Sequence, residues 1–274
     1  LIMAIITIAR QVAALGDEVA AKLATKLGYK FITRKDIEKS LVDFGFPENK
    51  LPKYDERKPG FFASLAKDRD EYLDYLHLAL LEAATKGDVV FIGRGAFALF
   101  AGVPNHVAIK LIADDDTRMK RLMEEFNWTE KQAKQRITES AENRAGFHKS
   151  FYNVDWSDPE HYSAVLNTGI LGAGEAADVI VSIADKIITA KAEKAGKKKI
   201  EELYTAQKLV NKLVFDHKVK IDFLHAVIEG DTLTLQGVAD SIATVEQTVR
   251  LAATEAPEYT IKSAISIIHD FKSY

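Results

Sequence analysis

Residues 4–18 read AIITIARQVAALGDE and set the architecture of the first half of the chain. The apolar, largely β-branched run from Ala4 to Ile8 predicts a buried strand. A helical pattern starts near Glu18, and only the short segment from Arg10 to Gly16 separates the two elements. A strand that passes through a tight loop into a helix is the first unit of an alternating α/β fold.

The loop has few of the groups that a phosphate-binding loop uses. A loop of the G-x-x-x-x-G-K-[ST] type needs glycines so that backbone N–H groups close on phosphate, a lysine for the outer phosphates and a hydroxyl for Mg²⁺. This loop contains Gly16 alone, and no lysine follows it. The first helical turn carries Asp17 and Glu18, which suit the positive end of the helix dipole but repel a phosphate. The sequence therefore predicts the architecture of a phosphate site with weakened chemistry.

Composition sets the outer limits. The 274 residues are 47% hydrophobic, which is enough for one medium domain and one small domain. The net charge of -3 provides no global basic field, so no nucleic-acid partner is expected. No apolar stretch reaches membrane length and the opening run is too short for a signal peptide, so we expect a cytoplasmic protein without a transmembrane segment. Zero cysteines exclude disulfides and thiolate chemistry.

Strands alternate with helices through residues 1–185. The predicted strands after the first are residues 29–33, 89–92, 107–112 and 179–181. The predicted helices are residues 18–27, 68–85, a segment that carries Arg118 and Arg121, and 129–142. Residues 45–62, rich in proline and lysine, predict a mobile insert. The pattern favours an α/β fold, a parallel sheet with helices on both faces and ligands at the carboxyl ends of its strands.

Three features follow predicted strands and so meet at that edge. The first is the loop from Arg10 to Gly16, the second is Gly93-Arg94-Gly95, and the third is Asp114 to Asp116. Glycines on both sides of Arg94 suit either a bidentate grip on phosphate or a tight turn with a surface arginine. The three aspartates favour helix caps over ligands for Mg²⁺, and no metal site made by the protein is predicted.

Several short motifs occur in register along the same region. They are the segments 5–11, 91–95, 118–121, 143–144, 147–149, 151–152, 155–156 and 162–168. Together they resemble the cytidylate kinase-like branch of the P-loop nucleoside monophosphate kinases, over about residues 4–185. The loop departs from that family, with Ala13, Ala14 and Leu15 in place of Gly-Ser-Gly and Asp17 in place of an arginine.

The resemblance implies a role for each matching group. Phosphates of the donor would contact Arg10, Gln11 and Gly16, and the acceptor would contact Gly93, Arg94 and Gly95. The implied catalytic cations are Arg118, Arg121, Arg144 and Lys149, which would spread the charge of the transferring phosphoryl group. The implied reaction is phosphoryl transfer from ATP, with Mg²⁺, to a nucleoside monophosphate such as CMP.

The degraded loop supports an alternative. One lost electrostatic contact in such a site costs on the order of 3 kcal/mol, and several contacts are missing here together. The alternative is a non-catalytic sensor or adaptor that binds a nucleotide or another phosphorylated small molecule.

The composition changes after residue 185. Residues 186–199 are rich in lysine and predict a basic linker. Residues 200–274 predict an α-β-β-α-β order with a turn at Gly230, which makes a small α+β domain. This order, with Leu235-Gln236-Gly237-Val238 before the second helix, resembles a BON domain. The resemblance implies a small binding module for a protein or lipid-surface partner.

Overall fold

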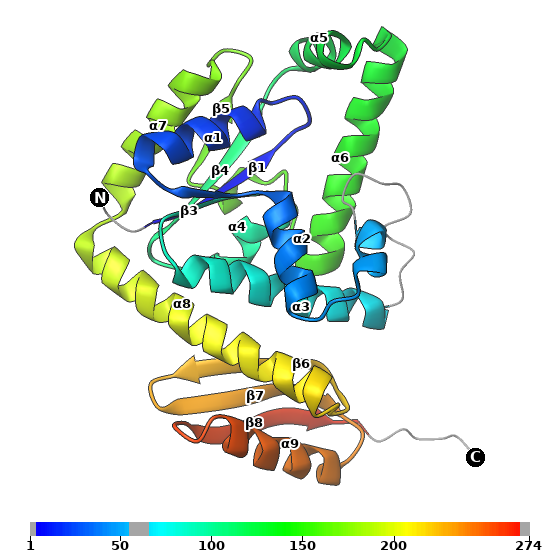
Figure 1. Cartoon of the computed structure of the whole chain (residues 1–274), viewed down its shortest axis with the longest axis vertical. Coiled ribbons are helices and arrows are strands. Elements are labelled where there is room, and N and C mark those ends of the chain that lie inside the picture. Colours follow the sequence, from blue (N-terminus) through cyan, green and yellow to red (C-terminus); the bar gives the residue numbers. More distant parts are fainter. Residues whose placement is uncertain (1–3, 55–65, 269–274) are drawn as a thin grey trace.

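The computed structural model describes residues 4–54 and 66–268 (Figure 1). Its larger part contains a five-stranded sheet in the order β2-β3-β1-β4-β5, in which every neighbouring pair is parallel. The strands are β1 (Ile5–Arg10), β2 (Lys30–Ile32), β3 (Val89–Ile92), β4 (His106–Ile112) and β5 (Ala164–Asn167). All four residues of β3 are buried, as expected for a strand covered on both faces.

Helices cover both faces of this sheet, which confirms the predicted fold class (Figure 1). They are α1 (Gly16–Leu27), α2 (Arg34–Asp43), η1 (Glu48–Tyr54), α3 (Ala66–Thr85), α4 (Ala96–Leu99), α5 (Asp115–Phe126), α6 (Glu130–Tyr152), η3 (Pro159–His161) and α7 (Ala173–Ile187). Neighbouring residues of β1 point to opposite faces: Ile5 joins the core under α2 and α3, and Ile6 joins the core under α1 and α7. In the described part, no helix has the length and apolarity needed to cross a bilayer.

One predicted strand is wrong. Residues 179–181 lie inside α7, and the last strand of the sheet is β5. The apolar run at 179–181 is part of a helical stripe, because Ala176, Ala177, Ile180 and Ala184 are buried on one face of α7. Three adjacent β-branched residues cannot show this period when they are considered without their flanks.

The mobile insert predicted at residues 45–62 contains a short helix in its first part. Residues 48–54 form the 3₁₀ helix η1, and residues 55–62 lie outside the described residues. The sequence also leaves α2 unpredicted, although a capping box starts it: the Thr33 side chain accepts from the N–H of Asp36, and the Asp36 carboxylate accepts from the N–H of Thr33.

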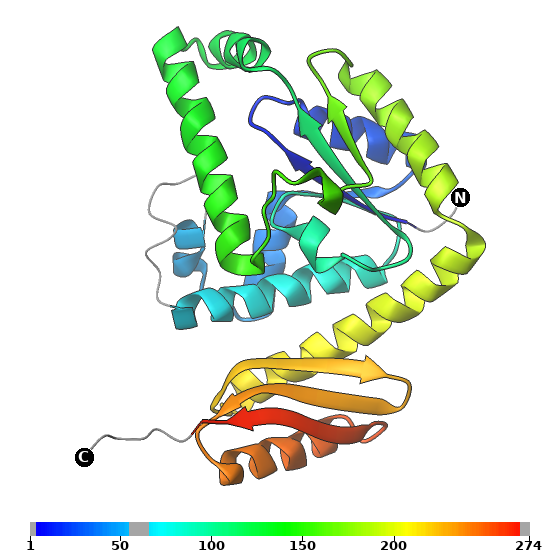
Figure 2. The same ribbon diagram turned by 180° about the vertical axis from the view of Figure 1, so that it is seen from behind.

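The smaller part has the predicted order of elements. These are α8 (Ala190–Asn211), the π-helical turn η4 (Lys212–Asp216), β6 (Ile221–Glu229), β7 (Thr232–Ala239), α9 (Ile242–Glu255) and β8 (Thr260–Ile267). The β6–β7 pair is antiparallel and the β7–β8 pair is parallel, and α8 and α9 share one apolar core with the strands (Figure 2). Residues 190–199 of the predicted linker are the start of α8.

The two parts meet where α8 packs along α3. The Gln207 amide donates to the Asp74 carboxylate at 3.2 Å, and the Tyr75 and Phe215 rings stack with centroids 4.4 Å apart. Burial raises the pKa of Asp74 to about 7. A carboxyl group and an aromatic pair therefore connect a helix of the larger part to the small part.

Candidate functional site

The loop between β1 and α1 has two non-glycine residues in the left-handed conformation. Ala13 has φ 58° and Leu15 has φ 55°. These are the two positions where the family resemblance expects glycine, which adopts this conformation without steric cost. For L-residues the left-handed region costs roughly 1–2 kcal/mol each. The surrounding structure must therefore stabilise the loop.

Contacts from three directions stabilise it. The Gln11 side chain accepts a hydrogen bond from the N–H of Ala113, just after β4, at 3.0 Å. On the other side, Arg121 of α5 donates to the carbonyl of Ala13 at 2.9 Å and to the carbonyl of Thr168 at 2.6 Å. Val12 and Ala13 also pack against an apolar cluster of α5 and α6 formed by Leu122, Ala133 and Ile137. This packing replaces the flexibility of glycine with side-chain contact.

Gly16 is the one glycine that the loop keeps, and its surroundings explain why. A Cβ atom on Gly16 would lie 2.7 Å from Cγ of Arg10 and 3.2 Å from Cδ1 of Ile92. The aliphatic part of Arg10 therefore crosses directly over the start of α1. A side chain at position 16 would displace it.

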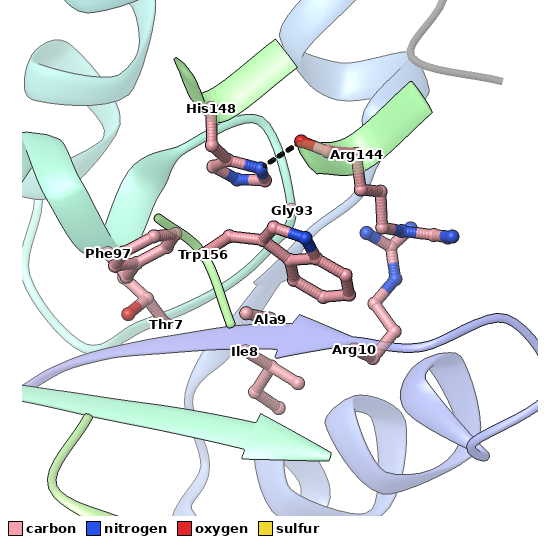
Figure 3. Close-up of a pocket in the computed structure, with 9 residues that line it drawn as sticks. All are labelled: Thr7, Ile8, Ala9, Arg10, Gly93, Phe97, Arg144, His148 and Trp156. Atoms are coloured by element: carbon pink, nitrogen blue, oxygen red, sulfur yellow. Dashed lines mark hydrogen bonds between the residues drawn. The ribbon is translucent and has the colours of Figure 1, made fainter. Parts of the chain in front are cut away.

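Arg10 and Arg144 converge at the carboxyl end of β1. Both line a small pocket of about 10 Å³ together with Gly93, His148 and Trp156. Figure 3 shows the two guanidinium groups on the same side of the Trp156 ring. Arg144 donates to the Ser140 carbonyl at 3.3 Å and to the Ser140 hydroxyl, and His148 bonds the Arg144 carbonyl at 2.7 Å. Two neighbouring cations favour the binding of an anion, and because the pocket itself has room for about one water molecule, a larger anion would lie beside it.

The pocket adjoins a larger cleft of about 980 Å³ between the loop and the α5–α6 corner. Its described lining includes four arginines and four acids, which are Arg10, Arg121, Arg136, Arg144, Asp17, Glu18, Glu124 and Glu125. Gln11 and Gly16 line it as well. The structure therefore brings the predicted donor-side residues together with two of the four predicted catalytic cations, Arg121 and Arg144.

Arg94 has different surroundings from the cleft arginines. It is 3% exposed, donates to the Tyr54 carbonyl at 2.7 Å and to the Tyr72 hydroxyl at 3.1 Å, and pairs with Glu38 at 3.1 Å. Its own carbonyl accepts from the Tyr152 hydroxyl, whose pKa is raised by burial. Arg94 thus connects α2, η1 and α3.

The remaining predicted cations lie outside the cleft. Arg118 is buried, pairs with Asp115 one turn earlier on α5, and leaves its Nε without a partner among the described residues. Lys149 is exposed on the last turn of α6. Gly93 lines the small pocket. Gly95 lies against the Tyr152 ring, and a Cβ atom on Gly95 would lie 2.0 Å from Cε2 of Tyr152. Of these four residues, Gly93 lies at the site, whereas Arg118, Lys149 and Gly95 lie elsewhere.

The aspartates after β4 act as helix caps. The Asp114 carboxylate accepts from the N–H of Thr117 at 2.8 Å, and this bond lowers the pKa of Asp114. Asp115 pairs with Arg118. Across the described residues, no group of three or more histidines and acids has the spacing of a metal site. A Mg²⁺ ion that enters with a nucleotide needs only one or two protein carboxylates, and Asp17 and Glu18, which line the cleft, would be the ones to hold it.

Sequence reasoning missed three groups near the site. Arg136 lies two turns before Arg144 on α6 and lines the cleft, so the helical period could have indicated it. Phe126 and Trp128 lie at the α5–α6 corner of the same cleft. Lys110 has no such signal: it is buried behind the small pocket, donates to the Trp156 carbonyl at 2.9 Å, and has a pKa lowered by burial.

The sheet order, the β1–α1 loop and the arginines gathered beside it define a P-loop kinase-like domain. The model of the Cytidylate kinase-like family matches residues 5–170, and the chain belongs to that family. Among curated proteins, none matches this chain.

Several solved structures are similar to part of this chain, and one of the three described here has a TM-score above 0.5. An uncharacterized protein from Eubacterium ventriosum is 23% identical with a TM-score of 0.53, over 66% of this chain and 98% of that one. A shikimate kinase from Acinetobacter baumannii, in complex with shikimate, is 13% identical with a TM-score of 0.41, over 67% and 94%. TT1252 from Thermus thermophilus is 14% identical with a TM-score of 0.44, over 69% and 100%.

Proposed function

We propose that the kinase-like domain binds the phosphate groups of a nucleotide in the arginine-lined cleft and acts as a nucleotide sensor without efficient phosphoryl transfer. The observation that carries the proposal is the convergence of Arg10 and Arg144 on one pocket at the end of β1. Guanidinium groups bind phosphate oxygens through paired hydrogen bonds. Arg121 and Arg136 also line the cleft, where the four arginines are interspersed with four acids.

Three features of the site argue against fast transfer. The loop has no lysine, and Asp17 and Glu18 add negative charge where the outer phosphates of a donor would lie. Arg121 donates to the carbonyl of Ala13, so part of its hydrogen-bonding capacity is used by the loop. Arg94, the expected acceptor ligand, pairs with Glu38. A site with this arrangement can hold phosphate but lacks several of the groups that stabilise the transition state.

Calorimetric titration of the full chain with ATP, with and without Mg²⁺, and with CMP tests the binding. We expect ATP to bind and Arg144→Gln to weaken it at least tenfold, because one charge-assisted contact is worth roughly 1.5–3 kcal/mol. Lys149→Gln is the matched control, since Lys149 is on the same helix but exposed and outside the cleft. Circular dichroism must show that both variants are folded. Equal ATP affinity in both variants would place the phosphates elsewhere.

A phosphotransferase is the second candidate, and membership of the cytidylate kinase-like family favours it. It would transfer phosphate from ATP to a nucleoside monophosphate such as CMP, with Mg²⁺ supplied by the nucleotide complex and held beside Asp17. A coupled assay of ADP release, at high enzyme concentration with each nucleoside monophosphate, separates the candidates. Turnover that Arg144→Gln abolishes would establish the kinase and overturn the sensor.

In the sensor proposal, the small domain is a BON-like module that binds a partner. Its order of elements supports this, and three large apolar residues, Phe223, Ile242 and Ile268, are at least 60% exposed. They lie near one end of the sheet, because Ile221 pairs with Ala239 and Ile268 donates to the Ala239 carbonyl. Apolar side chains at one end suit a protein or lipid-surface partner. Co-sedimentation with vesicles, for wild type and Phe223→Ser, tests the lipid form of the proposal.

A further inference from the structure

An aromatic pair stands at the open side of the arginine-lined cleft. The Phe126 and Trp128 rings stack with centroids 4.7 Å apart and planes 26° from parallel. Both residues line the cleft, and Phe126 remains 48% exposed. Asn127 between them is left-handed with φ 52°, which ends α5 and turns the chain into α6. The turn therefore brings two rings together at the surface of the site.

The pair is held in place by the same core that supports the loop. Trp128 packs against the cluster of Leu122, Ala133 and Ile137, which also contacts Val12 and Ala13 of the loop. Directly after Trp128, the Thr129 and Gln132 side chains close the capping box that starts α6. The rings and the loop consequently share one rigid support, so little conformational entropy is lost when a ligand contacts both.

We propose that this pair stacks the base of the bound nucleotide, so that the cleft selects nucleotides over phosphorylated metabolites without an aromatic ring. The inference rests on the proposed phosphate binding and specifies its ligand. Every nucleobase has a flat face that stacks on an aromatic side chain, and one such contact is worth roughly ten- to a hundredfold in affinity. The four arginines of the cleft would hold the phosphates while Phe126 covers the ring.

Two probes with a common triphosphate part separate the base from the phosphates: ATP and inorganic tripolyphosphate. Both are titrated calorimetrically into the full chain as wild type, Phe126→Ala and Ile187→Ala. Phe126 is exposed enough for its removal to leave the fold intact, which a melting curve checks. Ile187, which is 40% exposed on α7 and does not line the cleft, is the control.

We expect wild type to bind ATP at least tenfold more tightly than tripolyphosphate. Phe126→Ala should lose most of that difference while tripolyphosphate binding stays constant, and Ile187→Ala should change neither. Equal binding of the two probes, or ATP binding that Phe126→Ala does not weaken, would overturn the aromatic contact and leave phosphate binding intact. Binding of neither probe would overturn both proposals.

Discussion

Two corners of the same sheet edge hold buried arginines, and their partners differ. At the β3 corner, Arg94 pairs with Glu38 and donates to the Tyr54 carbonyl, so its charge is matched within the chain. At the β1 corner, Arg144 donates to Ser140 and shares its pocket with a second cation, Arg10. Arg94 therefore braces three elements, whereas Arg10 and Arg144 bring two positive charges to one pocket, which is the arrangement that the proposed phosphate binding uses.

This difference divides the roles that the family resemblance implies. The acceptor role of Arg94 would require release of Glu38 and of the contacts to η1 and α3, which the free energy of acceptor binding would have to offset. Arg10 and Arg144 line the larger cleft on the side where the resemblance places the donor. The four predictions below test this contrast between a brace and an anion site.

The largest expected effect is on stability, at the brace. Arg94→Ala should lower the free energy of unfolding by about 3 kcal/mol, because it leaves the Tyr54 carbonyl without this donor and removes one of the two arginines that pair with Glu38. Urea denaturation followed by circular dichroism measures this. Adding Glu38→Gln should recover little of the loss, since Arg34 still pairs with Glu38 in the single variant. A loss below about 0.5 kcal/mol would mean that Arg94 is not structural.

The second prediction concerns Asp74, a buried carboxyl group at the contact between α3 and α8. Arg94 is buried beside a group of opposite charge, whereas burial disfavours the charged form of Asp74. Asp74 receives a hydrogen bond from the neutral Gln207 amide, and burial raises its pKa to about 7 from 3.8. A raised folded-state pKa contributes stability that is complete below about pH 4 and is lost as the pH rises through about 7. We expect this contribution to be on the order of 2 kcal/mol.

Urea denaturation between pH 4 and pH 8 tests the direction. Carboxyl groups elsewhere also titrate in this range, so the informative quantity is the difference between wild type and Asp74→Asn. As the pH rises, the free energy of unfolding of Asp74→Asn should increase relative to that of wild type. Asp43→Asn, at the exposed end of α2, is the control and should keep the wild-type profile. Parallel profiles for wild type and Asp74→Asn would contradict the prediction.

At the anion site, Gly16→Ala tests the path of Arg10. The new Cβ would lie 2.7 Å from Cγ of Arg10, so the side chain must move away from the start of α1. We expect ATP affinity to fall about tenfold, or roughly 1.4 kcal/mol, in a calorimetric titration. Gly174→Ala in α7, where a Cβ meets nothing within 4 Å, should leave ATP affinity unchanged and slightly raise stability. Unaltered ATP binding in Gly16→Ala would remove Arg10 from the site.

The sequence predicted much of the fold because its main signals are local. The strand at residues 4–8, the fully apolar strand at 89–92 and the order of elements after residue 200 each follow from short periodic patterns. The strand predicted at 179–181 was wrong because a three-residue apolar run does not distinguish a strand from a buried helical stripe. Periodicity over a longer window would have favoured α7.

The site was less accessible from the sequence, because charge partners come from distant segments. Glu38 is 56 residues from Arg94, and no local pattern relates them. The aromatic corner at Phe126 and Trp128 depends on a left-handed turn at Asn127 and on the packing of α6. Motifs can therefore locate the arginines of this fold, but only tertiary packing determines which groups surround each arginine.

The smallest expected effect concerns the loop itself. Ala13→Gly removes the strain of a left-handed alanine and so stabilises the folded state. Lost side-chain packing and the greater freedom of the unfolded chain oppose this gain, so we expect the free energy of unfolding to rise by about 0.5 kcal/mol. Ala14→Gly is the matched control. Ala14 is 1% exposed and has no positive φ, so this substitution should lower the free energy of unfolding by about 1 kcal/mol. Opposite signs in urea denaturation would show that the loop stores strain at position 13. If both variants lose stability equally, the side-chain packing of α5 and α6 against the loop, and not its backbone conformation, would dominate the energy of the anion site.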